Sequence, residues 1–417
     1  MVTLRPFKAL RPHKKYVDRV AALPYDTMNT EEARIMAKDN PYNYLRIDRA
    51  EIDLDPQIDI HDPRVYEKAG QNLRDFIDKG IFIQEDEPSL YIYRETMDGR
   101  VQVGIVGCLA VDESLDGIIK KHEHTKPDKV EDRTRHIEAC QANTGTILVT
   151  YRNDTIVDAI IADQMTQVPL YDFISEDGVG HTVWKLDVQA REGLVKAFEG
   201  LDNLYVADGH HRTAAAENYA KKMREKNPNY TGQEEFNYYL AMIAPENNLY
   251  VMDYNRVLTD LNGHSLEEYL DLVGKIFHIE AVGQAYKPEK KYQYGMYIND
   301  QWYKLDVREE VVAEIREKSK NTAIDLLDVS LLHDLLIEPI LGIDVPQKDK
   351  RIDFIGGIRG LEEIEKRVDQ DMKLGFALYP TAIEELMAVA DMDGVMPAKS
   401  TWFEPKVRCG LFLHMMD

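Results

Sequence analysis

The sequence predicts a mixed α/β protein, and three observations support this fold class. Residues 89–94 and 101–110 have the composition of two strands, and the turn at 97–99 joins them as a hairpin. In the middle of the chain, apolar runs such as 146–151 alternate with helical segments. There, the apolar run 204–207 stops at an Asp-Gly pair and continues as an alanine-rich helix.

Helices are expected on both sides of these strands. The first begins after Asn29 or Thr30, either of which caps it, and glutamates occupy its first turn. A second helix runs from Arg64 to about Lys79 and ends at Gly80. The other predicted helices begin at Asp132-Arg133 or lie near 265–276, 325–341 and 381–390.

A chain of 417 residues is long for a single hydrophobic core, so two or three subdomains are expected. The patterns divide it into an N-terminal α/β region (1–110), a central region (111–260) and a C-terminal α/β region (261–417). Internal repeats and low-complexity linkers are not evident in the sequence.

The net charge of −23 bears on the class of partner. Nucleic-acid affinity depends on lysine and arginine neutralising phosphates, and an acidic surface repels a duplex unless one face is basic. Short basic clusters such as 221–224 are offset by nearby carboxylates. We therefore expect no DNA partner, whereas a local pocket on an acidic protein can still be positive enough for a small anion.

Three cysteines, Cys108, Cys140 and Cys409, lie far apart with no C-x-x-C spacing, so neither a disulfide framework nor a cysteine-rich metal site is indicated. The N-terminus lacks the pattern of a signal peptide, and no apolar run reaches the roughly 18 residues of a membrane span. We expect a cytoplasmic protein without a membrane partner.

The turn at Asp208-Gly209 is the strongest functional signal in the sequence. His210, His211 and Arg212 open the following helix, whose first N–H groups lack intrahelical acceptors. Free N–H donors, the positive end of the helix dipole and an arginine able to form two parallel hydrogen bonds all favour a phosphate there. The alternative is a plain turn in which Asp208 caps the helix.

A second dense polar segment spans residues 122–138. His122 and His124 alternate as on a strand, like a pair of metal ligands, but zinc requires more nitrogen or sulfur ligands and no third is evident at suitable spacing. We interpret Glu123 as a general base or a magnesium ligand. Arg133 contacts phosphate or pairs with a neighbouring acid, and a solvated loop is the alternative for the whole segment.

Two further segments carry candidate residues. Residues 399–406 form a stretch too irregular for a helix, held extended or turned by prolines at 397 and 405. It is suited to binding a triphosphate or a carboxylate, and the alternative is a surface loop anchored by Trp402 and Phe403. Tyr25 and Asp26 follow a proline and either reach the same site or form a turn. His333-Asp334 on an apolar helix is interpreted as structural.

Six motifs spread over the chain resemble those of the DUF1015 family. They are RPFKALRP at 5–12, PYD at 24–26, HEHT at 122–125, DR at 132–133, DGHHR at 208–212 and MPAKSTWFEPK at 396–406. The DGHHR turn also resembles the phosphate-binding turn of the ParB/sulfiredoxin-like fold, most closely its variant in archaeal free L-serine kinases.

This resemblance implies a ParB/sulfiredoxin-like core in the central region, elaborated by further subdomains, with the C-terminal region completing the site. It implies a small-molecule kinase that transfers phosphate from ATP or ADP, with Mg²⁺, to free L-serine or a similar hydroxyl metabolite. The alternatives are a ParB-type nucleotide-binding switch, CTPase- or ATPase-like, and a metal-dependent hydrolase.

The expected site residues fall into four groups by role. They are Glu123, Asp208 and His210 for catalysis; Gly209, His210, His211, Arg212, Arg133, Lys399, Ser400, Thr401 and Lys406 for the phosphates of the nucleotide; Tyr25, Asp26 and His122 for the substrate; and Glu123 with Asp208 for Mg²⁺.

Overall fold

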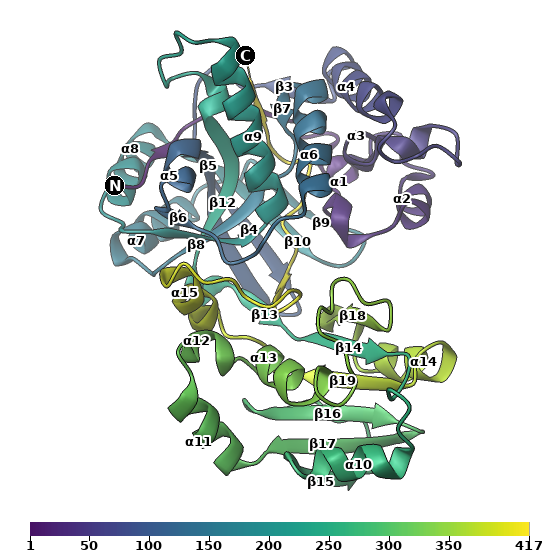
Figure 1. Ribbon diagram of the computed structural model, residues 1–417. Coiled ribbons are helices and arrows are strands. Elements are labelled where there is room, and N and C mark those ends of the chain that lie inside the picture. Colours follow the sequence, from purple (N-terminus) through teal and green to yellow (C-terminus); the bar gives the residue numbers. More distant parts are fainter. Residues whose placement is uncertain (417) are drawn as a thin grey trace. The chain divides into compact units, whose positions relative to one another are not determined.

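The computed structural model describes residues 1–416, which form two compact units. The first contains Met1–Leu249 and the segment from Pro405 onward, and the second contains Tyr250–Glu404 (Figure 1). Both combine helices with β-sheets, which confirms the predicted mixed α/β class. None of the helices among the described residues is both long and apolar enough to cross a membrane.

The first unit contains two sheets. Their strands are β1 (Leu4–Arg5), β2 (Ala9–Pro12), β3 (Phe82–Gln84), β4 (Tyr91–Met97), β5 (Arg100–Ala110), β6 (Ile119–Lys120), β7 (Ala142–Asn143), β8 (Ile147–Tyr151), β9 (Tyr171–Ile174), β10 (Gly180–Lys185), β11 (Leu204–Asp208), β12 (Tyr238–Pro245) and β21 (Leu413–Met415).

The same unit contains the helices α1 to α9. Their bounds are α1 (Val17–Val20), α2 (Thr30–Ala37), α3 (Leu45–Asp48), α4 (Pro63–Asp78), α5 (Val111–Leu115), α6 (Pro127–Cys140), α7 (Thr155–Gln164), α8 (Val188–Phe198) and α9 (His210–Lys226).

The larger sheet has nine strands in the order β6-β11-β8-β12-β5-β4-β10-β9, with β1 paired to β5. The pairs β6–β11 and β8–β12 are parallel and the others are antiparallel. Since β6 and β11 run in the same direction, the segments that follow them leave the sheet at the same edge. This brings residues after Lys120 close to those after Asp208.

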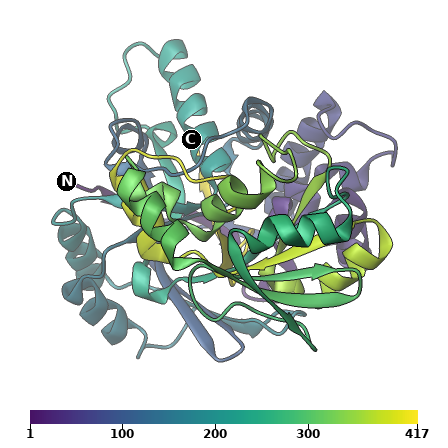
Figure 2. The ribbon, with the colours of Figure 1, turned by 60° about the horizontal axis from the view of Figure 1, so that its bottom comes forward.

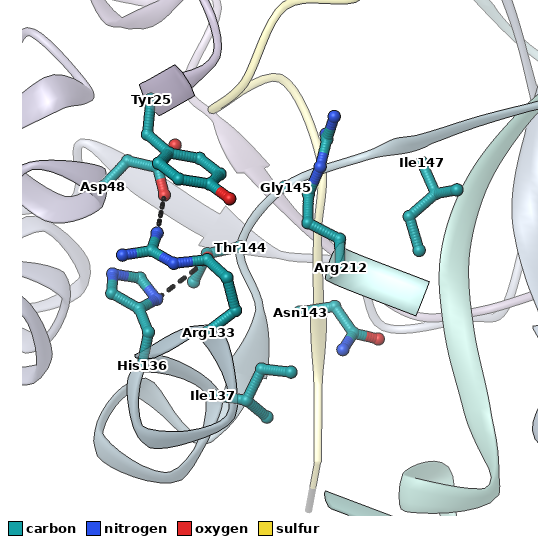
Figure 3. Close-up of a pocket in the computed structure, with 10 residues that line it drawn as sticks. All are labelled: Tyr25, Asp48, Arg133, His136, Ile137, Asn143, Thr144, Gly145, Ile147 and Arg212. Carbon is teal, nitrogen blue, oxygen red and sulfur yellow. Dashed lines mark hydrogen bonds and ion pairs between the residues drawn. The ribbon is translucent and has the colours of Figure 1, made fainter. Parts of the chain in front are cut away.

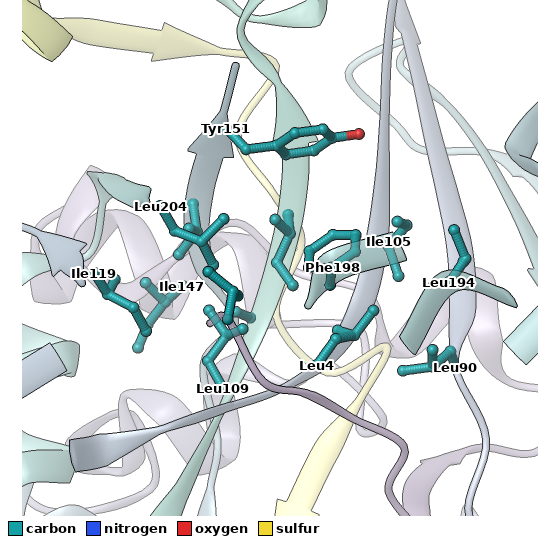
Figure 4. Packing of buried hydrophobic residues seen from close by; sticks show 14 of the residues in the cluster. Leu4, Leu90, Ile105, Leu109, Ile119, Ile147, Tyr151, Leu194, Phe198 and Leu204 are labelled. Atoms are coloured by element: carbon teal, nitrogen blue, oxygen red, sulfur yellow. The ribbon is translucent and has the colours of Figure 1, made fainter. Parts of the chain in front are cut away.

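The apolar positions of these strands form the main core of the unit. On β8, Ile147, Val149 and Tyr151 all belong to it, as the side-chain alternation of a strand requires. Helix α8 contributes Leu194 and Phe198, and the Phe198 ring lies 5.6 Å from that of Tyr151 (Figure 4). Burial of this cluster fixes the register of the strands and therefore the edge from which the polar loops extend.

The smaller sheet has four strands in the order β3-β2-β21-β7. Around it, α1 to α4 pack with side chains such as Tyr44, Leu73 and Phe82 in a second core. Helix α6 contacts both α4 and α9, and Ile137 of α6 packs with Tyr219 of α9. Figure 1 shows α6 beside α9, so residues of α6 lie near α9.

The second unit is built on a six-stranded antiparallel sheet in the order β15-β17-β16-β19-β14-β18, beside the two-stranded pair β13-β20. Its strands are β13 (Tyr250–Met252), β14 (Tyr254–Leu258), β15 (Phe277–Val282), β16 (Gln293–Ile298), β17 (Gln301–Val307), β18 (Ile352–Gly356), β19 (Leu374–Leu378) and β20 (Trp402–Glu404).

Six α-helices accompany this sheet, and α14 and α10 lie along it (Figure 2). Ile364 of α14 packs on Val257, Trp302 and Ala377 of the sheet. The helices are α10 (Leu266–Gly274), α11 (Glu309–Lys318), α12 (Thr322–Asp325), α13 (Asp328–Leu332), α14 (Glu362–Gln370) and α15 (Ile383–Asp391).

Local signals predicted many of these elements. Asn29 caps α2: its side chain accepts the backbone N–H of Glu32, and the side chain of Glu32 accepts the backbone N–H of Asn29. This reciprocal pair is a capping box. Asp62 caps α4, and Gly80 follows that helix with a φ of +65°. The hairpin β4–β5 turns at Asp98-Gly99, both with positive φ, as predicted.

Two segments and the division into regions differ from the prediction. Helix α6 begins at Pro127 rather than Asp132, because proline is well suited to the first helical position. The expected helix 325–341 is replaced by α13 and a π-helical turn, His333–Ile337, while α12 ends at Asp325. The two compact units also do not coincide with the three regions expected from the sequence, since β5 pairs with β1 and with β12 across residue 110.

Candidate functional site

Helix α9 begins directly after strand β11. Asp208 is the last residue of the strand, and Gly209 takes a φ of +101°, which the absence of a Cβ makes favourable. Gly209 offers no side-chain cap, and its carbonyl accepts the N–H of Thr213 at 2.9 Å. The predicted strand–turn–helix is confirmed, and the residue at the N-cap position contributes no side chain to cap the helix.

The guanidinium of Arg212 lies over Gly209. A Cβ built on Gly209 would lie 3.1 Å from Nε and 3.2 Å from Cζ of Arg212, and one on Gly145 would lie 3.1 Å from its Cδ. Arg212 donates from Nη1 to the carbonyl of Thr146, and its buried Nε has no hydrogen-bond partner among the described residues. The two glycines therefore make room for a guanidinium that keeps an unused donor.

Asp208 forms an ion pair with Lys406, whose Nζ lies 3.1 Å from Oδ2. Burial opposes ionisation of Asp208, but the charges of Lys406 and Arg212 outweigh it and hold the pKa of the carboxyl well below its usual range. The pair joins residues 198 positions apart in the chain. Asp208 is thus a fixed anion that holds Lys406 at the end of β11.

Arg212 lines a small pocket with a cavity volume of about 20 Å³. Figure 3 shows Tyr25, Asp48 and Arg133 on one side of it, with Arg212 and Ile147 on the other. The full lining consists of Tyr25, Asp48, Arg133, His136, Ile137, Asn143, Thr144, Gly145, Ile147 and Arg212. The pocket brings Tyr25, Arg133 and Arg212, three of the sequence-predicted site residues, together.

Arg133 is paired with acids as well as lining the pocket. Its Nε lies 2.8 Å from Asp132 and its Nη1 lies 3.3 Å from Asp48, while its guanidinium stacks 4.0 Å from the centre of the Tyr25 ring. Burial lowers the pKa of Arg133, but the surrounding negative groups outweigh it and raise the value. Burial raises the pKa of Tyr25, so both side chains keep their protons at neutral pH.

Several lining residues were missed by the sequence analysis. His136 is buried, with Nε2 3.0 Å from the carbonyl of Ile47 and Nδ1 3.1 Å from the hydroxyl of Thr144, and burial lowers its pKa. The spacing of His136 from Arg133, three residues on one helix, was the available signal. Asp48 and Thr144 gave none, because only the packing of α3 and the strand β7 brings them to this pocket.

His122, Glu123 and His210 form a second group beside the turn. Nδ1 of His210 lies 3.6 Å from Oε2 of Glu123, and the two imidazole rings meet edge to face with centroids 4.4 Å apart. Burial lowers the pKa of His122 and of His210 to about 3, so both are neutral. The expected pairing of His122 with His124 on a strand is wrong: residues 121–126 form an irregular loop in which His124 is exposed.

A family of proteins matches residues 4–330, more than three quarters of the chain, and is described as protein of unknown function, DUF1015. The chain belongs to the DUF1015 family. The match contains the motifs at 5–12, 24–26, 122–125, 132–133 and 208–212, whereas that at 396–406 lies beyond it. Family membership confirms the expectation from the sequence.

No curated protein matches this DUF1015 chain by sequence. Among solved structures, a free serine kinase in complex with AMP has 12% identity and a TM-score of 0.34, covering 74% of this chain and 91% of its own. A mutant of a free serine kinase with ADP has 12% identity and a TM-score of 0.35, covering 76% and 94%. C-terminally truncated SbnI from Staphylococcus aureus has 12% identity and a TM-score of 0.37, covering 73% and 85%.

The other predicted site residues of the DUF1015 protein lie elsewhere or on its surface. Asp26 is exposed, although its charge acts on Arg212, and His211 accepts the N–H of Lys126 at 3.2 Å. In the second unit, the carbonyl of Lys399 accepts from Arg256 and the buried Ser400 donates to the carbonyl of Pro397. The roles expected for Lys399, Ser400 and Thr401 stay predictions.

Proposed function

We propose that this protein is a nucleotide-dependent phosphotransferase whose acceptor is a small hydroxyl metabolite. ATP or ADP is the donor, and the phosphoryl group binds at the first turn of α9. Free L-serine is the first acceptor to test, because the motif at 208–212 resembles the phosphate-binding turn of free L-serine kinases. The ParB/sulfiredoxin-like character of the core is part of this proposal.

The observation that carries the proposal is the unused donor of Arg212. Phosphate oxygens are good acceptors for guanidinium N–H groups, and a helix N-terminus adds N–H donors and a positive dipole. Arg212 already lines a pocket, and Gly209 lets its guanidinium approach the start of the helix. A phosphoryl group there would be bound by a side chain and by the backbone together.

Lys406 and Glu123 have proposed roles on either side of this turn. Lys406 is held by Asp208 and can move its charge toward a phosphate when one binds. Glu123 is half-buried near the neutral His210, and a carboxylate in this position can orient or deprotonate a hydroxyl. Tyr25 and Asp26 remain the proposed contacts of the acceptor, whereas His122, expected among them, is 1% exposed and too buried to contact it directly.

Mg²⁺ was expected on Glu123 and Asp208, and the surroundings of these groups test its fit. Mg²⁺ prefers oxygen ligands in octahedral geometry. The carboxylate of Asp208 is paired with Lys406, and a carboxylate oxygen of Glu123 lies within 4.8 Å of ring nitrogens of His122 and His210. These two carboxylates alone do not fit a dedicated Mg²⁺ site, so the phosphates of the nucleotide would supply the other oxygens.

Arg212→Ala tests the proposal. Arg34→Ala is the matched control, because Arg34 is also partly buried and donates to the backbone carbonyls of Glu51 and Ile52 away from the pocket. With ATP or ADP, Mg²⁺ and L-serine, mass spectrometry should detect phosphoserine for the wild type and Arg34→Ala. Arg212→Ala should be slower by about 100-fold or more.

Other results would point to different functions. If Arg212→Ala transfers phosphate at the wild-type rate, the proposed phosphate site is wrong. Nucleotide binding without any phosphorylated product, across a panel of hydroxyl-bearing amino acids, would favour the nucleotide-dependent switch instead. Release of inorganic phosphate or cleavage of another substrate only with a bound metal would favour the hydrolase.

A further inference from the structure

His122, Glu123 and His210 come from two segments that the larger sheet brings together. The parallel pairing of β6 with β11 aligns Ile119 with Leu204 and Lys120 with Tyr205. His122 follows the end of β6 by two residues, and His210 follows the end of β11 by two residues. One potential ligand atom of each of the three side chains lies within 4.8 Å of the others.

The imidazole of His122 is buried without partners. His122 is 1% exposed, and neither its Nδ1 nor its Nε2 has a hydrogen-bond partner among the described residues. Leaving a buried polar group unsatisfied costs about 1–3 kcal/mol, so most proteins pair such a group or place a ligand on it. The unused nitrogens of His122 therefore point to a ligand that accepts lone pairs.

The other two side chains can offer lone pairs to the same point. Nε2 of His210 lies 3.5 Å from the backbone N of His122, and Nδ1 lies 3.6 Å from Oε2 of Glu123. To bind an ion through Nδ1, neutral His210 carries its proton on Nε2 and gives up the long contact with the N–H of His122. That separation is close to the distance between two ligands of one metal ion, since metal–ligand bonds are about 2.0–2.2 Å. A small inward movement of each side chain would bring three donors onto one ion.

We propose that His122, Glu123 and His210 bind a divalent first-row transition-metal ion of the zinc type. Two neutral imidazoles and one carboxylate are the donor set of zinc sites that keep a fourth position open for water or substrate. Imidazole suits Zn²⁺, Cu²⁺, Fe²⁺ and Ni²⁺, whereas Mg²⁺ prefers oxygen. The third ligand missing from the sequence is His210, which only the β6–β11 pairing brings near His122.

A second group, His333, Asp334 and Glu338, provides a matched comparison. Its side chains also lie within 4.8 Å of one another, but both carboxylates are exposed and the His333 side chain is 22% exposed. All three residues come from one π-helical turn and the residue after it. Solvent can satisfy both carboxylates, but Nδ1 of His333 is also buried without a hydrogen-bond partner among the described residues. This group has one imidazole instead of two, so we expect weaker binding of a zinc-type ion there.

The test uses the full chain and Zn²⁺ alone, so it does not depend on any phosphotransferase activity. After removal of metals with a chelator, Zn²⁺ is titrated in competition with a chromophoric chelator, and native mass spectrometry counts bound ions. The wild type and His333→Ala should bind one ion with the same affinity. His122→Ala and His210→Ala should bind at least about 100-fold more weakly, since each removes a direct ligand.

Glu123→Gln is the variant least expected to disturb folding, because it replaces a partly exposed side chain with one of the same shape. Co²⁺ bound to the wild type should show the intense visible absorption of a four-coordinate ion, and Glu123→Gln should reduce it. Equal Zn²⁺ affinity of the wild type and both histidine variants would overturn the proposal. Loss of binding only in His333→Ala would also overturn it and assign the ion to the other group.

Discussion

Two buried histidines of the first unit, His181 and His122, differ in their partners. His181, on β10, is fully buried, and both of its ring nitrogens have hydrogen-bond partners. The hydroxyl of Tyr93 lies 2.7 Å from Nδ1, and the hydroxyl of Ser175 lies 2.9 Å from Nε2. His122 is 1% exposed, and neither of its ring nitrogens has a hydrogen-bond partner among the described residues. A satisfied polar network stabilises a fold, whereas an unsatisfied buried group marks a place for a ligand.

The side chains around the two histidines differ in the same way, in whether their buried polar atoms have hydrogen-bond partners. Around His181, the fully buried Glu95 accepts hydrogen bonds from Tyr93 and from Gln102, and Arg408 pairs with Asp177. Beside the turn at the start of α9, the buried Nε of Arg212 also lacks a partner in the described part of the chain. We therefore assign a structural role to the β4–β10 network, whereas the turn region keeps buried polar atoms of His122 and Arg212 without hydrogen-bond partners among the described residues.

Of the changes considered, lowering the pH should have the largest effect on the free energy of unfolding. Burial, helped by the charge of Arg408, lowers the pKa of His181 to about 3, below the value of about 6.5 of an unfolded histidine. Between these values only the unfolded chain binds the proton, so the free energy of unfolding falls as the pH decreases from 6.5. His181 alone should contribute a loss of about 3 kcal/mol by pH 4.

Urea unfolding at stepwise pH measures this effect. In His181→Gln, which cannot take up the proton, the dependence on pH between 6.5 and 4 should be weaker by about one proton. An unchanged slope would show that His181 is not buried as a neutral group.

Tyr93→Phe should have the next largest effect. It removes the hydroxyl that bonds both Nδ1 of His181 and Oε1 of Glu95, so two buried groups lose a partner. We expect a loss of about 1–3 kcal/mol in the free energy of unfolding. Tyr230→Phe, at a residue that is 40% exposed, should change it by less than about 0.5 kcal/mol, and equal effects of the two would contradict a structural network.

Gly209→Ala and Gly99→Ala form a matched pair from the two regions. Both glycines have positive φ, +101° and +77°, so each alanine should cost about 1–2 kcal/mol of stability. A Cβ on Gly99 meets nothing within 4 Å, whereas one on Gly209 lies 3.1 Å from Nε of Arg212. Only Gly209→Ala should therefore weaken nucleotide binding, which calorimetry measures. Weaker binding in both variants would mean that the loss does not come from displacing Arg212.

His122→Leu should have the smallest effect on stability. Because its imidazole nitrogens form no hydrogen bonds, replacing them with apolar atoms leaves no partner unsatisfied. We expect a change within about 1 kcal/mol in the free energy of unfolding of the metal-free protein. A loss as large as that of Tyr93→Phe would mean that His122 belongs to a structural network after all.

The local pattern was sufficient for many elements. The capping box at Asn29 and Glu32, the hairpin turn at Asp98-Gly99 and the strand–turn–helix at Asp208 were all identified from neighbouring residues, because each depends on contacts within a few positions. The division of the segment 325–341 was missed, since only tertiary packing interrupts that apolar run.

The candidate site was predicted in part for the same reason. Arg212, Arg133 and Tyr25 were singled out for their chemistry, and the structure brings all three to one pocket. Asp48 and Thr144 of the same pocket carry no local signal, because their positions depend on how α3, α6 and β7 pack together.

The sequence by itself determined the family, the mixed α/β class and the turn that ends β11, because motifs and turns are encoded in consecutive residues. Only the tertiary structure decided that His210 meets His122 and Glu123 and that Lys406 pairs with Asp208. Such contacts depend on strand order and register, which are set by burial of the whole core. For the same reason, a third metal ligand absent from the local spacing can lie 88 residues away in the chain.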